Sequence, residues 1–376
     1  MCGIAGYLNS PHAPQEPTLL SRMAAALRHR GPDARGIFTA PGAGLAHTRL
    51  AIVDEEGGAQ PMALPDYGPV ISFNGEIFNH VELRESLIRR GRRFATRSDT
   101  EVILHLYELH GPDCVHHLNG DFAFALWDPR LKRLMLARDR MGVRPLYYAQ
   151  RGDGLFFASE MKAIFCYPGF EPEIDPEGIN QIFTIWVNIP PRTVFKGVNE
   201  LAPGHVMTAS PRGIAVNRFW RMRFPDEHDY EDRPLSHYTD RIQELLYDAV
   251  TLRLRADVPV AAYLSGGLDS SAITSLVKKH HVNDLITFSV AFSDRNFDER
   301  GYQNRMVDLL KTDHRVIEAT YESIGGAFSD VVWFSEKPMI RTAPAPLFIL
   351  AGLVRSNGIK VVLTGEGADE FFGGYD

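Results

Sequence analysis

The first residue that could do chemistry is a cysteine, which directly follows the initiator methionine in the stretch MCGIAGY. A small second residue permits removal of Met1, and Cys2 would then carry a free α-amino group. Because such an amine has a pKa of about 8, it can act near neutral pH as the base for its own thiol. The stretch therefore predicts an N-terminal nucleophile. The alternative is that Cys2 is merely the second residue of a strand.

A second candidate is the loop SGGLDSS, residues 265–271, which follows an apolar run. Its glycines let the backbone approach an anion, and its hydroxyls and the start of a following helix supply donors. These residues are Ser265, Gly266, Gly267, Ser270 and Ser271. Asp269 would repel a phosphate, so we expect it to hold a Mg²⁺ ion that the phosphate also binds. The alternative is a strand-to-helix turn with a serine cap. A Walker loop is excluded, because the sequence contains no Gly-Lys dipeptide.

Three carboxylates occupy the stretch TGEGADE, residues 364–370, again directly after an apolar run. They are Glu366, Asp369 and Glu370. Acidic side chains at the carboxyl end of a strand face the ligand crevice of an open α/β sheet, which favours a catalytic or metal-binding role. The stretch lacks the third glycine of a dinucleotide-binding fingerprint.

Further polar residues with binding chemistry lie in RHRGPD, HTRLAIVD, FNGEIFNH and RSDTEVI, between residues 28 and 103. Arg49 has the planar fork that binds a carboxylate at two points. Asn74 and Gly75 offer a side-chain amide and a flexible backbone N–H that suit an oxyanion, and Asp99 could hold an ammonium group. Each has an ordinary alternative, namely a surface arginine, an Asn-Gly turn or a helix-capping aspartate.

The elements that must position these residues change character along the chain. In residues 1–211, short apolar runs at 69–77, 121–128, 133–139 and 154–160 are separated by Gly, Pro, Asp and Asn, as hairpin strands are. Two stretches, 80–91 and 99–111, have helical spacing and close on a glycine. This pattern predicts an antiparallel sheet system with helices packed on it, an α+β domain.

Residues 212–234 lose this period and gain charge and proline, which indicates a linker. In residues 235–376, near-continuous apolar strands at 258–264, 285–292, 314–319 and 359–365 alternate with helical patterns at 270–281, 302–311, 324–334 and 346–358. That alternation predicts an α/β domain with a parallel sheet covered on both faces.

The composition of the chain limits which classes of protein it can belong to. The 376 residues exceed what one core usually serves, and a net charge of -7 provides no basic field for nucleic acid or an anionic membrane. No apolar run approaches the roughly 18 residues of a membrane helix, and no secretory signal opens the chain. Three cysteines, an odd number, indicate the reducing cytoplasm. Cys114 stands beside His116 and His117 without a second ligand pair, so we expect a polar helix end there, and Cys166 should be a small buried residue.

These stretches together resemble a known family. MCGIAGY, RHRGPD, HTRLAIVD, NGEIFNH, SDTEVI and DFAFALWD…LARDRMGVRPLYY are similar to glutamine amidotransferases with an N-terminal nucleophile. SGGLDSS and TGEGADEFFGGYD are similar to the ATP-pyrophosphatase half of glutamine-hydrolysing asparagine synthetases. The resemblance runs in order from Met1 to Asp376. It implies a four-layer αββα sandwich for the first domain and an ATP-pyrophosphatase-type α/β domain for the second.

For the first domain, the resemblance implies glutamine hydrolysis. Cys2 would attack the glutamine carboxamide, form a thioester and free ammonia, while Asn74 and Gly75 contact the oxyanion. Asp99 would be the partner of the substrate amine. The residues implied in glutamine binding are Arg49, Leu50, Ile52, Val53, Asn74, Glu76 and Asp99.

For the second domain, the resemblance implies that ATP activates aspartate to aspartyl-AMP, with pyrophosphate leaving. Ammonia, delivered through a sheltered channel, would then displace AMP to give asparagine. Glu366 would be the base for ammonia, and Asp269 and Asp369 would be Mg²⁺ ligands. The implied ATP-binding residues are Leu264, Ser265, Gly266, Gly267, Leu268, Asp269, Ser270, Ser271, Val290, Thr364 and Gly365. The expected partners are these small substrates, with neither nucleic acid nor membrane, and a homodimer is compatible with the resemblance.

Two alternatives stay open. The acceptor could be another carboxylate, in secondary metabolism or polysaccharide modification. The stretch RTAPAPLF, residues 341–348, could line the acceptor pocket, with Arg341 as the partner of the acceptor carboxylate, or it could be a proline-rich loop that only packs against the rest of the domain. The protein could also be a silent nucleotide- or glutamine-sensing module, against which the intact Cys2, Asn74, Asp269 and Glu366 argue. The family's second half continues beyond the GGY phrase, so we expect this chain to be a fragment, incomplete at its C-terminus, or a reduced variant.

Overall fold

The computed structural model describes residues 1–9, 16–229, 231–280 and 284–374. Residue 230 of the expected linker, residue 281 of an expected helix and the last two residues of the chain lie outside the described residues. The chain forms two compact units, Met1–Arg223 and Phe224–Asp376.

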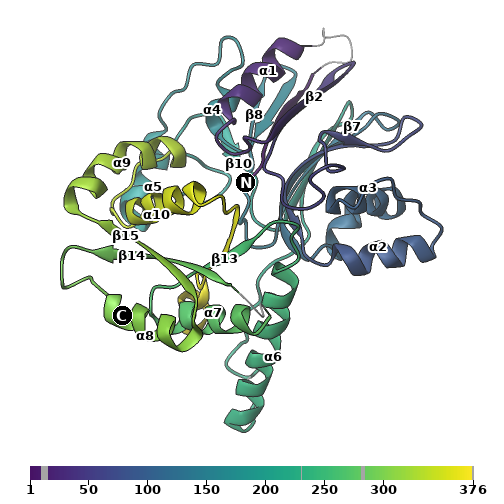
Figure 1. Ribbon diagram of the computed structural model, residues 1–376. Helices are drawn as coiled ribbons and strands as arrows, with labels where there is room; N and C mark the ends of the chain where they lie inside the picture. The colour runs from purple at the N-terminus through teal and green to yellow at the C-terminus, as the bar shows by residue number, and fades with distance from the viewer. Residues whose placement is uncertain (10–15, 230, 281–283, 375–376) are drawn as a thin grey trace. The chain divides into compact units, whose positions relative to one another are not determined.

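In the part of the chain that the structure describes, the first unit contains two six-stranded antiparallel sheets, ordered β10-β8-β9-β1-β3-β2 and β12-β11-β7-β6-β5-β4 (Figure 1). The first sheet consists of β1 (Gly3–Leu8), β2 (Ala34–Ala40), β3 (Ala43–Arg49), β8 (Tyr147–Arg151), β9 (Gly154–Ala158) and β10 (Val198–Glu200). The second consists of β4 (Met62–Ala63), β5 (Val70–Ile77), β6 (Gly120–Asp128), β7 (Arg133–Arg138), β11 (His205–Ser210) and β12 (Gly213–Arg218).

The alternation of side chains along β6 explains why the two sheets stack. Phe122 and Phe124 belong to a core that includes residues of α2 (His80–Arg89) and α3 (Asp99–His110). Ala123 and Ala125, which point the other way, pack in a core with residues of β1, β3 and β9. Because successive side chains of a strand face opposite sides, β6 is covered by helices on one face and by the first sheet on the other.

Helices also cover the outer face of the first sheet. Leu20 and Met23 of α1 (Pro17–Ala26), Ile164 of α4 (Met161–Ile164) and Ile182 of α5 (Pro176–Ile185) share a core with residues of β1 and β9. The four-layer αββα sandwich is therefore confirmed. The sequence predicts two helices in this unit, whereas α1, α4 and α5 form as well. Helices α1 and α5 begin at a proline, which suits the first helical position because the N–H there has no partner in the helix.

Strand β12 differs from the sequence expectation, because it lies within residues 212–234, where we expected a linker. It pairs with β11 from His205 opposite Arg218 to Ser210 opposite Gly213, and all its residues are exposed. Its sequence, GIAVNR, places Ile214 and Val216 at alternate positions, but this pattern is short and is followed directly by the charged, proline-containing residues that indicated a linker. The first unit consequently extends to Arg223.

The second unit contains a parallel sheet in the order β15-β14-β13-β16, as the sequence predicts (Figure 1). Its strands are β13 (Val260–Tyr263), β14 (Ile286–Phe292), β15 (Asp313–Ala319) and β16 (Val361–Leu363). The helices are α6 (Leu235–Arg253), α7 (Leu268–His280), α8 (Arg300–Leu310), α9 (Tyr321–Ser335), α10 (Pro344–Ser356) and α11 (Ala368–Phe372). One core joins the sheet to α6 and α7 and another joins it to α10, so both faces are covered.

The strand order determines where a ligand can bind in this unit. The chain leaves β13 toward β14 on one side and later returns to β16 on the other, so the order reverses between β13 and β16. Ligands of open α/β sheets bind outside the carboxyl ends of the strands at such a reversal. The stretches SGGLDSS and TGEGADE follow these two strands directly.

The remaining cysteines belong to the first unit. Cys114 is fully buried in a 3₁₀ helix, Gly111–His117, within the core under α3. Cys166 is half-buried, not buried as predicted, and its thiol donates to the carbonyl oxygen of Lys162 over 3.6 Å. Among the described residues, no helix is long and apolar enough to span a membrane.

Candidate functional site

The thiol of Cys2 lies at the start of β1, beside the loop that follows β3. Gly3 pairs with Thr48, and this register brings Leu50 to the cysteine. The backbone N–H of Leu50 lies 3.4 Å from Cys2 Sγ, and the thiol in turn lies 3.6 Å from the Leu50 carbonyl oxygen. Burial raises the pKa of the Cys2 thiol, and burial lowers the pKa of the Met1 α-amine to about 5.

Asn74 provides an unpartnered amide on β5. It is fully buried, and neither Nδ2 nor Oδ1 has a hydrogen-bond partner among the described residues. A buried polar group without a partner costs about 1–3 kcal/mol, so such groups are rare outside sites that await a ligand. Strands β1 and β5 contact each other across the sandwich, which brings this amide to the sheet face that β1 also lines.

Gly75, the next residue, has no room for a side chain. A Cβ at this position would lie 2.1 Å from the carbonyl oxygen of Asp121 and 2.8 Å from Cα of Phe122, both on β6. The glycine is therefore required by the close approach of two strands, and the Asn-Gly turn considered above is not formed, because both residues lie inside β5.

Asp99 lies at the first position of α3, directly after the N-cap residue Ser98. Its Oδ2 accepts a hydrogen bond of 2.9 Å from the backbone N–H of Ile77, the last residue of β5. Burial raises the pKa of this carboxyl group, and its charge acts on the Cys2 thiol. The fold thus brings Asp99, Asn74 and Cys2 to the same end of the sandwich.

Arg49, the last residue of β3, is buried, and its guanidinium group holds the following loop. Nη1 donates to the carbonyl oxygen of Glu55 over 2.6 Å. Nη2 donates to the backbone carbonyl oxygens of Asp54, over 2.5 Å, and of Val53, over 3.2 Å. The sequence predicted an open fork for a carboxylate ligand, whereas these bonds already engage both terminal nitrogens with backbone. Ile52, half-buried, lies in the loop that these bonds order.

Sequence reasoning missed a charged cluster behind Cys2. Arg30 Nε donates to the carbonyl oxygen of Cys2 over 2.9 Å, and Arg30 Nη1 lies 2.8 Å from Glu160 Oε1. The stretch RHRGPD signalled Arg30, but Glu160 lies 130 positions away, where no local pattern reveals the partner.

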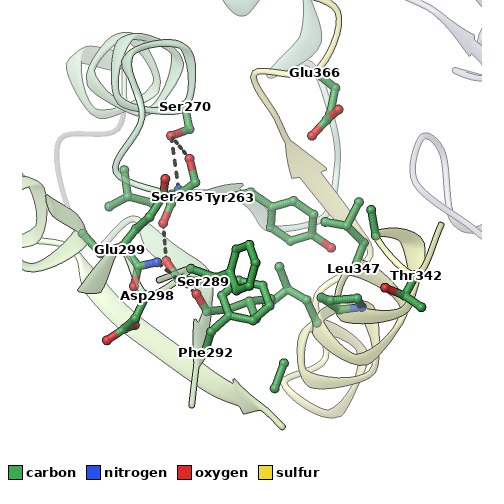
Figure 2. A pocket seen from close by; sticks show the side chains of 18 of the residues that line it. Tyr263, Ser265, Ser270, Ser289, Phe292, Asp298, Glu299, Thr342, Leu347 and Glu366 are labelled. Carbon is green, nitrogen blue, oxygen red and sulfur yellow. Dashed lines mark hydrogen bonds between the residues drawn. The ribbon is translucent and has the colours of Figure 1, made fainter. Parts of the chain in front are cut away.

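A cavity of about 1320 Å³ opens at the carboxyl ends of β13, β14 and β16 in the second unit. Figure 2 shows Ser265 and Ser270 of the glycine loop joined by hydrogen bonds, with Glu366 on a separate segment that lines the same cavity. Nine of the residues expected in ATP or metal chemistry line it, namely Leu264, Ser265, Asp269, Ser270, Val290, Thr364, Gly365, Glu366 and Asp369. Gly266, Gly267, Leu268 and Ser271 belong to the loop but are absent from the cavity lining.

The serines of the loop are bonded to one another. Ser270 Oγ accepts from the backbone N–H of Ser265 over 3.1 Å and lies 2.9 Å from Ser265 Oγ. Ser265 Oγ accepts from the backbone N–H of Gly267 over 3.2 Å. These bonds fix the turn between β13 and α7.

Two glycines allow the segments around this loop to approach closely. Gly266 has a φ of +91°, and a Cβ there would lie 2.7 Å from Cβ of Tyr302 on α8. A Cβ on Gly365 would lie 2.9 Å from both Cβ of Asp269 and the backbone nitrogen of Ser270. The stretches SGGLDSS and TGEGADE therefore touch at Gly365.

Carboxylates dominate the charge around the cavity. Its lining contains Asp269, Asp294, Asp298, Glu299, Glu366, Asp369 and Glu370, and among these described lining residues Arg341 is the one Lys or Arg. The described residues contain no group of three His, Cys, Asp or Glu side chains that could hold a metal ion by themselves. Mg²⁺ at nucleotide sites is typically bound by one or two carboxylates together with phosphate oxygens and water, and this donor set fits such an ion.

Comparisons with known proteins divide the chain as the structure does. Residues 1–220 match the glutamine amidotransferase domain family, and residues 241–376 match the asparagine synthase family. The chain is 36% identical to "Asparagine synthetase [glutamine-hydrolyzing] 3" of Bacillus subtilis, over all of this chain and 63% of that protein. It is also 36% identical to "Asparagine synthetase [glutamine-hydrolyzing] 1" of the same organism, over 59% of that protein.

A fungal protein of another name is similar as well. "Amidase chry2" of Gibberella zeae is 33% identical over all of this chain and 60% of its own length. The chain thus spans about 60% of the length of the curated relatives it matches. The chain therefore belongs to the glutamine amidotransferase domain family, and a region that matches the asparagine synthase family follows this domain in the sequence.

Proposed function

We propose that the first unit hydrolyses glutamine at Cys2. The observation that carries this proposal is the buried, unpartnered amide of Asn74 at the end of the sandwich where the Cys2 thiol lies. After removal of Met1, the thiol passes its proton to the α-amine of Cys2, and Sγ attacks the carboxamide carbon of glutamine. The oxyanion accepts hydrogen bonds from Asn74 Nδ2 and the Gly75 N–H. Ammonia leaves with the proton, and water hydrolyses the thioester to glutamate.

In this proposal the neighbouring charges orient the substrate. The Asp99 carboxylate binds the substrate ammonium. The positive charge of the ammonium favours the ionised form of Asp99, whereas burial raises the pKa of this group and favours the neutral form. Arg49 contributes its positive charge toward the substrate carboxylate and keeps residues 53–55 in place through its bonds to their carbonyl groups. Leu50, Ile52, Val53 and Glu76 form the rest of the glutamine site.

For the second unit we propose that ATP and aspartate bind in the cavity at β13 and β16. The aspartate carboxylate attacks the α-phosphorus of ATP, pyrophosphate leaves, and ammonia displaces AMP to give asparagine. Glu366, which lines the cavity, takes the proton of the attacking ammonia. Asp269 and Asp369 would hold Mg²⁺, which neutralises phosphate charge when bound. Loop residues 264–271, together with Val290, Thr364 and Gly365, would bind the nucleotide. The proposal places these small-molecule reactions in the cytoplasm.

A second acceptor is favoured by two observations. Part of the cavity wall is apolar, with Phe292, Ile340 and Leu347 among its residues, which suits an acceptor with an apolar body. The chain is also similar to a protein named an amidase. An amide ligase that acts on a carboxylate with an apolar body would use the same chemistry.

The products of ATP test this part of the proposal. In the protein that contains this chain, turnover with aspartate and ammonia should yield AMP and pyrophosphate in equal amounts with asparagine. Stoichiometric ADP and orthophosphate would contradict the mechanism. AMP formation that requires an apolar carboxylic acid and not aspartate would favour the second acceptor.

A further inference from the structure

Cys2 lies one residue outside the hydrogen-bonded ladder of β1. Pairing begins at Gly3 opposite Thr48 on β3 and at Ala5 opposite Ala158 on β9. Chain termini are poorly ordered unless they are tied down, whereas a catalytic group must be held within about 0.5 Å of its productive position. The nucleophile therefore needs tethers that the sheet does not supply.

One tether is the side chain of Arg30. Its Nε donates a 2.9 Å hydrogen bond to the carbonyl oxygen of Cys2, and the side chain is 7% exposed. This bond fixes the peptide group that joins the nucleophile to Gly3. Arg30 is effective only if its own long side chain is held in one rotamer, since free arginine rotamers carry about 2 kcal/mol of entropy.

Glu160 holds Arg30 and is itself tied to β1. Its Oε1 accepts from Arg30 Nη1 over 2.8 Å. The preceding residue, Ser159, accepts from the Ile4 N–H through Oγ over 3.0 Å and donates from its own N–H to the Ile4 carbonyl oxygen over 2.8 Å. The strand that carries the nucleophile is therefore linked at Ile4, through Ser159 and Glu160, to the arginine that holds Cys2.

Besides Arg30, two further basic side chains, those of His29 and Lys162, lie against the Glu160 carboxylate. His29 Nε2 lies 2.9 Å from Oε1, and Lys162 Nζ lies 2.7 Å from Oε2. Burial alone would raise the pKa of Glu160, but the bonds from His29 and Lys162 and the charge and bond of Arg30 lower it to about 2. The carboxylate is thus ionised at all ordinary pH values and offsets the charge of Arg30.

We propose that Glu160 is a positioning residue for the Cys2 nucleophile, which it orients through Arg30 while it neutralises the arginine's charge. This inference rests on the proposed glutaminase reaction. It predicts two separable effects. The position of Arg30 depends on the length of the Glu160 side chain, whereas the net charge beside Cys2 depends on the charge of Glu160.

Two substitutions separate these effects. Glu160→Asp keeps the charge but is shorter by one methylene, so it should lose the bond to Arg30. We expect roughly a tenfold lower kcat for glutaminase, with KM for glutamine within about twofold and an unchanged pH profile. Glu160→Gln keeps an acceptor for Arg30 but removes the charge. The positive charge of Arg30 is then no longer offset and lowers the pKa of the Cys2 α-amine, so the acidic limb of the kcat/KM profile should move down by roughly half a pH unit.

The charged groups near this end of the chain are those that act on the preceding α-amine of Met1: burial lowers its pKa most, Cys2 and Asp33 raise it, and Arg30 and Arg144 lower it. Neither substitution touches Asp33 or Arg144. The matched control is Glu173→Gln, which removes an exposed carboxylate paired with Lys196 and should leave kcat and the pH profile as in the wild type.

The rate at which iodoacetamide alkylates Cys2, measured against pH, gives a second readout that needs no glutamine. The same downward pH shift is expected for Glu160→Gln and none for Glu160→Asp. If the wild type hydrolyses no glutamine, the proposed function fails, and the alkylation profiles still decide the role of Glu160. Profiles and kcat values that match the wild type in both variants would overturn the inference, as would a loss confined to KM. If Glu160→Gln does not fold, the kcat of Glu160→Asp alone tests the role of Glu160, and a kcat equal to that of the wild type would overturn the inference.

Discussion

The backbone N–H of Leu50 lies 3.4 Å from Cys2 Sγ. Leu50 directly follows β3, whose register with β1 places Thr48 opposite Gly3, so the pairing of two central strands determines what the thiol contacts. A donor at this distance stabilises a thiolate more than a thiol. Cys2, the proposed nucleophile, is thus held by sheet pairing on one side and by the Arg30–Glu160 pair on the other.

The unpartnered amide of Asn74 leads to the first prediction. Asn74→Ala should lower the kcat of glutaminase by roughly two to three orders of magnitude, the usual cost of losing one oxyanion donor. The fold should survive, because the amide makes no hydrogen bond to a described residue. Steady-state kinetics with glutamine measures the effect, and Asn217→Ala on the exposed strand β12 is the control. Equal kcat values for the two variants would remove Asn74 from the mechanism.

The close approach at Gly365 leads to the second prediction. Gly365→Ala places a Cβ 2.9 Å from Cβ of Asp269, so the two loops must separate. We expect the KM for ATP to rise at least about tenfold while glutaminase activity is retained. Gly352→Ala is the control, because no atom lies within 4 Å of its added Cβ in α10, and it should leave the KM for ATP unchanged. An unaltered KM in Gly365→Ala would show that the contact is irrelevant to the nucleotide.

Asp269 leads to the third prediction. Asp269→Asn keeps the shape of a cavity residue but removes a negative charge, so pyrophosphate release should fall roughly tenfold or more and need a higher Mg²⁺ concentration. A titration with Mg²⁺ at fixed ATP measures this, with Asp330→Asn on the exposed side of α9 as the control. If Asp269→Asn needs no more Mg²⁺ than the wild type, Asp269 is not a ligand of the ion.

His47 leads to a prediction about stability. It is fully buried, and its Nδ1 lies 3.2 Å from Ser72 Oγ. Burial and the charge of Arg49 lower its pKa from 6.5 to about 3. Because the unfolded chain binds a proton near pH 6.5 and the folded chain does not, the free energy of unfolding falls as pH drops from about 6.5 toward 3. The slope from this group is roughly 1.4 kcal/mol per pH unit.

Thermal unfolding at pH 7 and pH 5 measures this dependence. His47→Gln should lose less stability between the two values than the wild type, whereas His228→Gln, a substitution at an exposed residue, should behave as the wild type. Equal losses in all three proteins would contradict the assignment of a neutral, buried His47.

The sequence predicted those features that depend on local pattern. Apolar runs located β5, β6, β13 and β14, and glycine with serine located the loop at Ser265. It could not predict Arg49 holding its own loop, because backbone carbonyl groups carry no sequence signal. The Arg30–Glu160 pair could not be predicted either, because its two residues are far apart in sequence and meet only when β9 pairs with β1.

Residue 2 provides the most direct test of the central claim, that this chain contains an N-terminal cysteine nucleophile which hydrolyses glutamine. The purified wild-type protein should lack Met1 by mass spectrometry, release glutamate and ammonia from glutamine, and acquire on residue 2 the mass of a glutamyl thioester when the reaction is acid-quenched. Cys2→Ala should show neither turnover nor adduct and should keep its ATP-binding affinity. Glutamine hydrolysis that persists in Cys2→Ala, or a wild-type protein that retains Met1 and still turns over, would contradict the account.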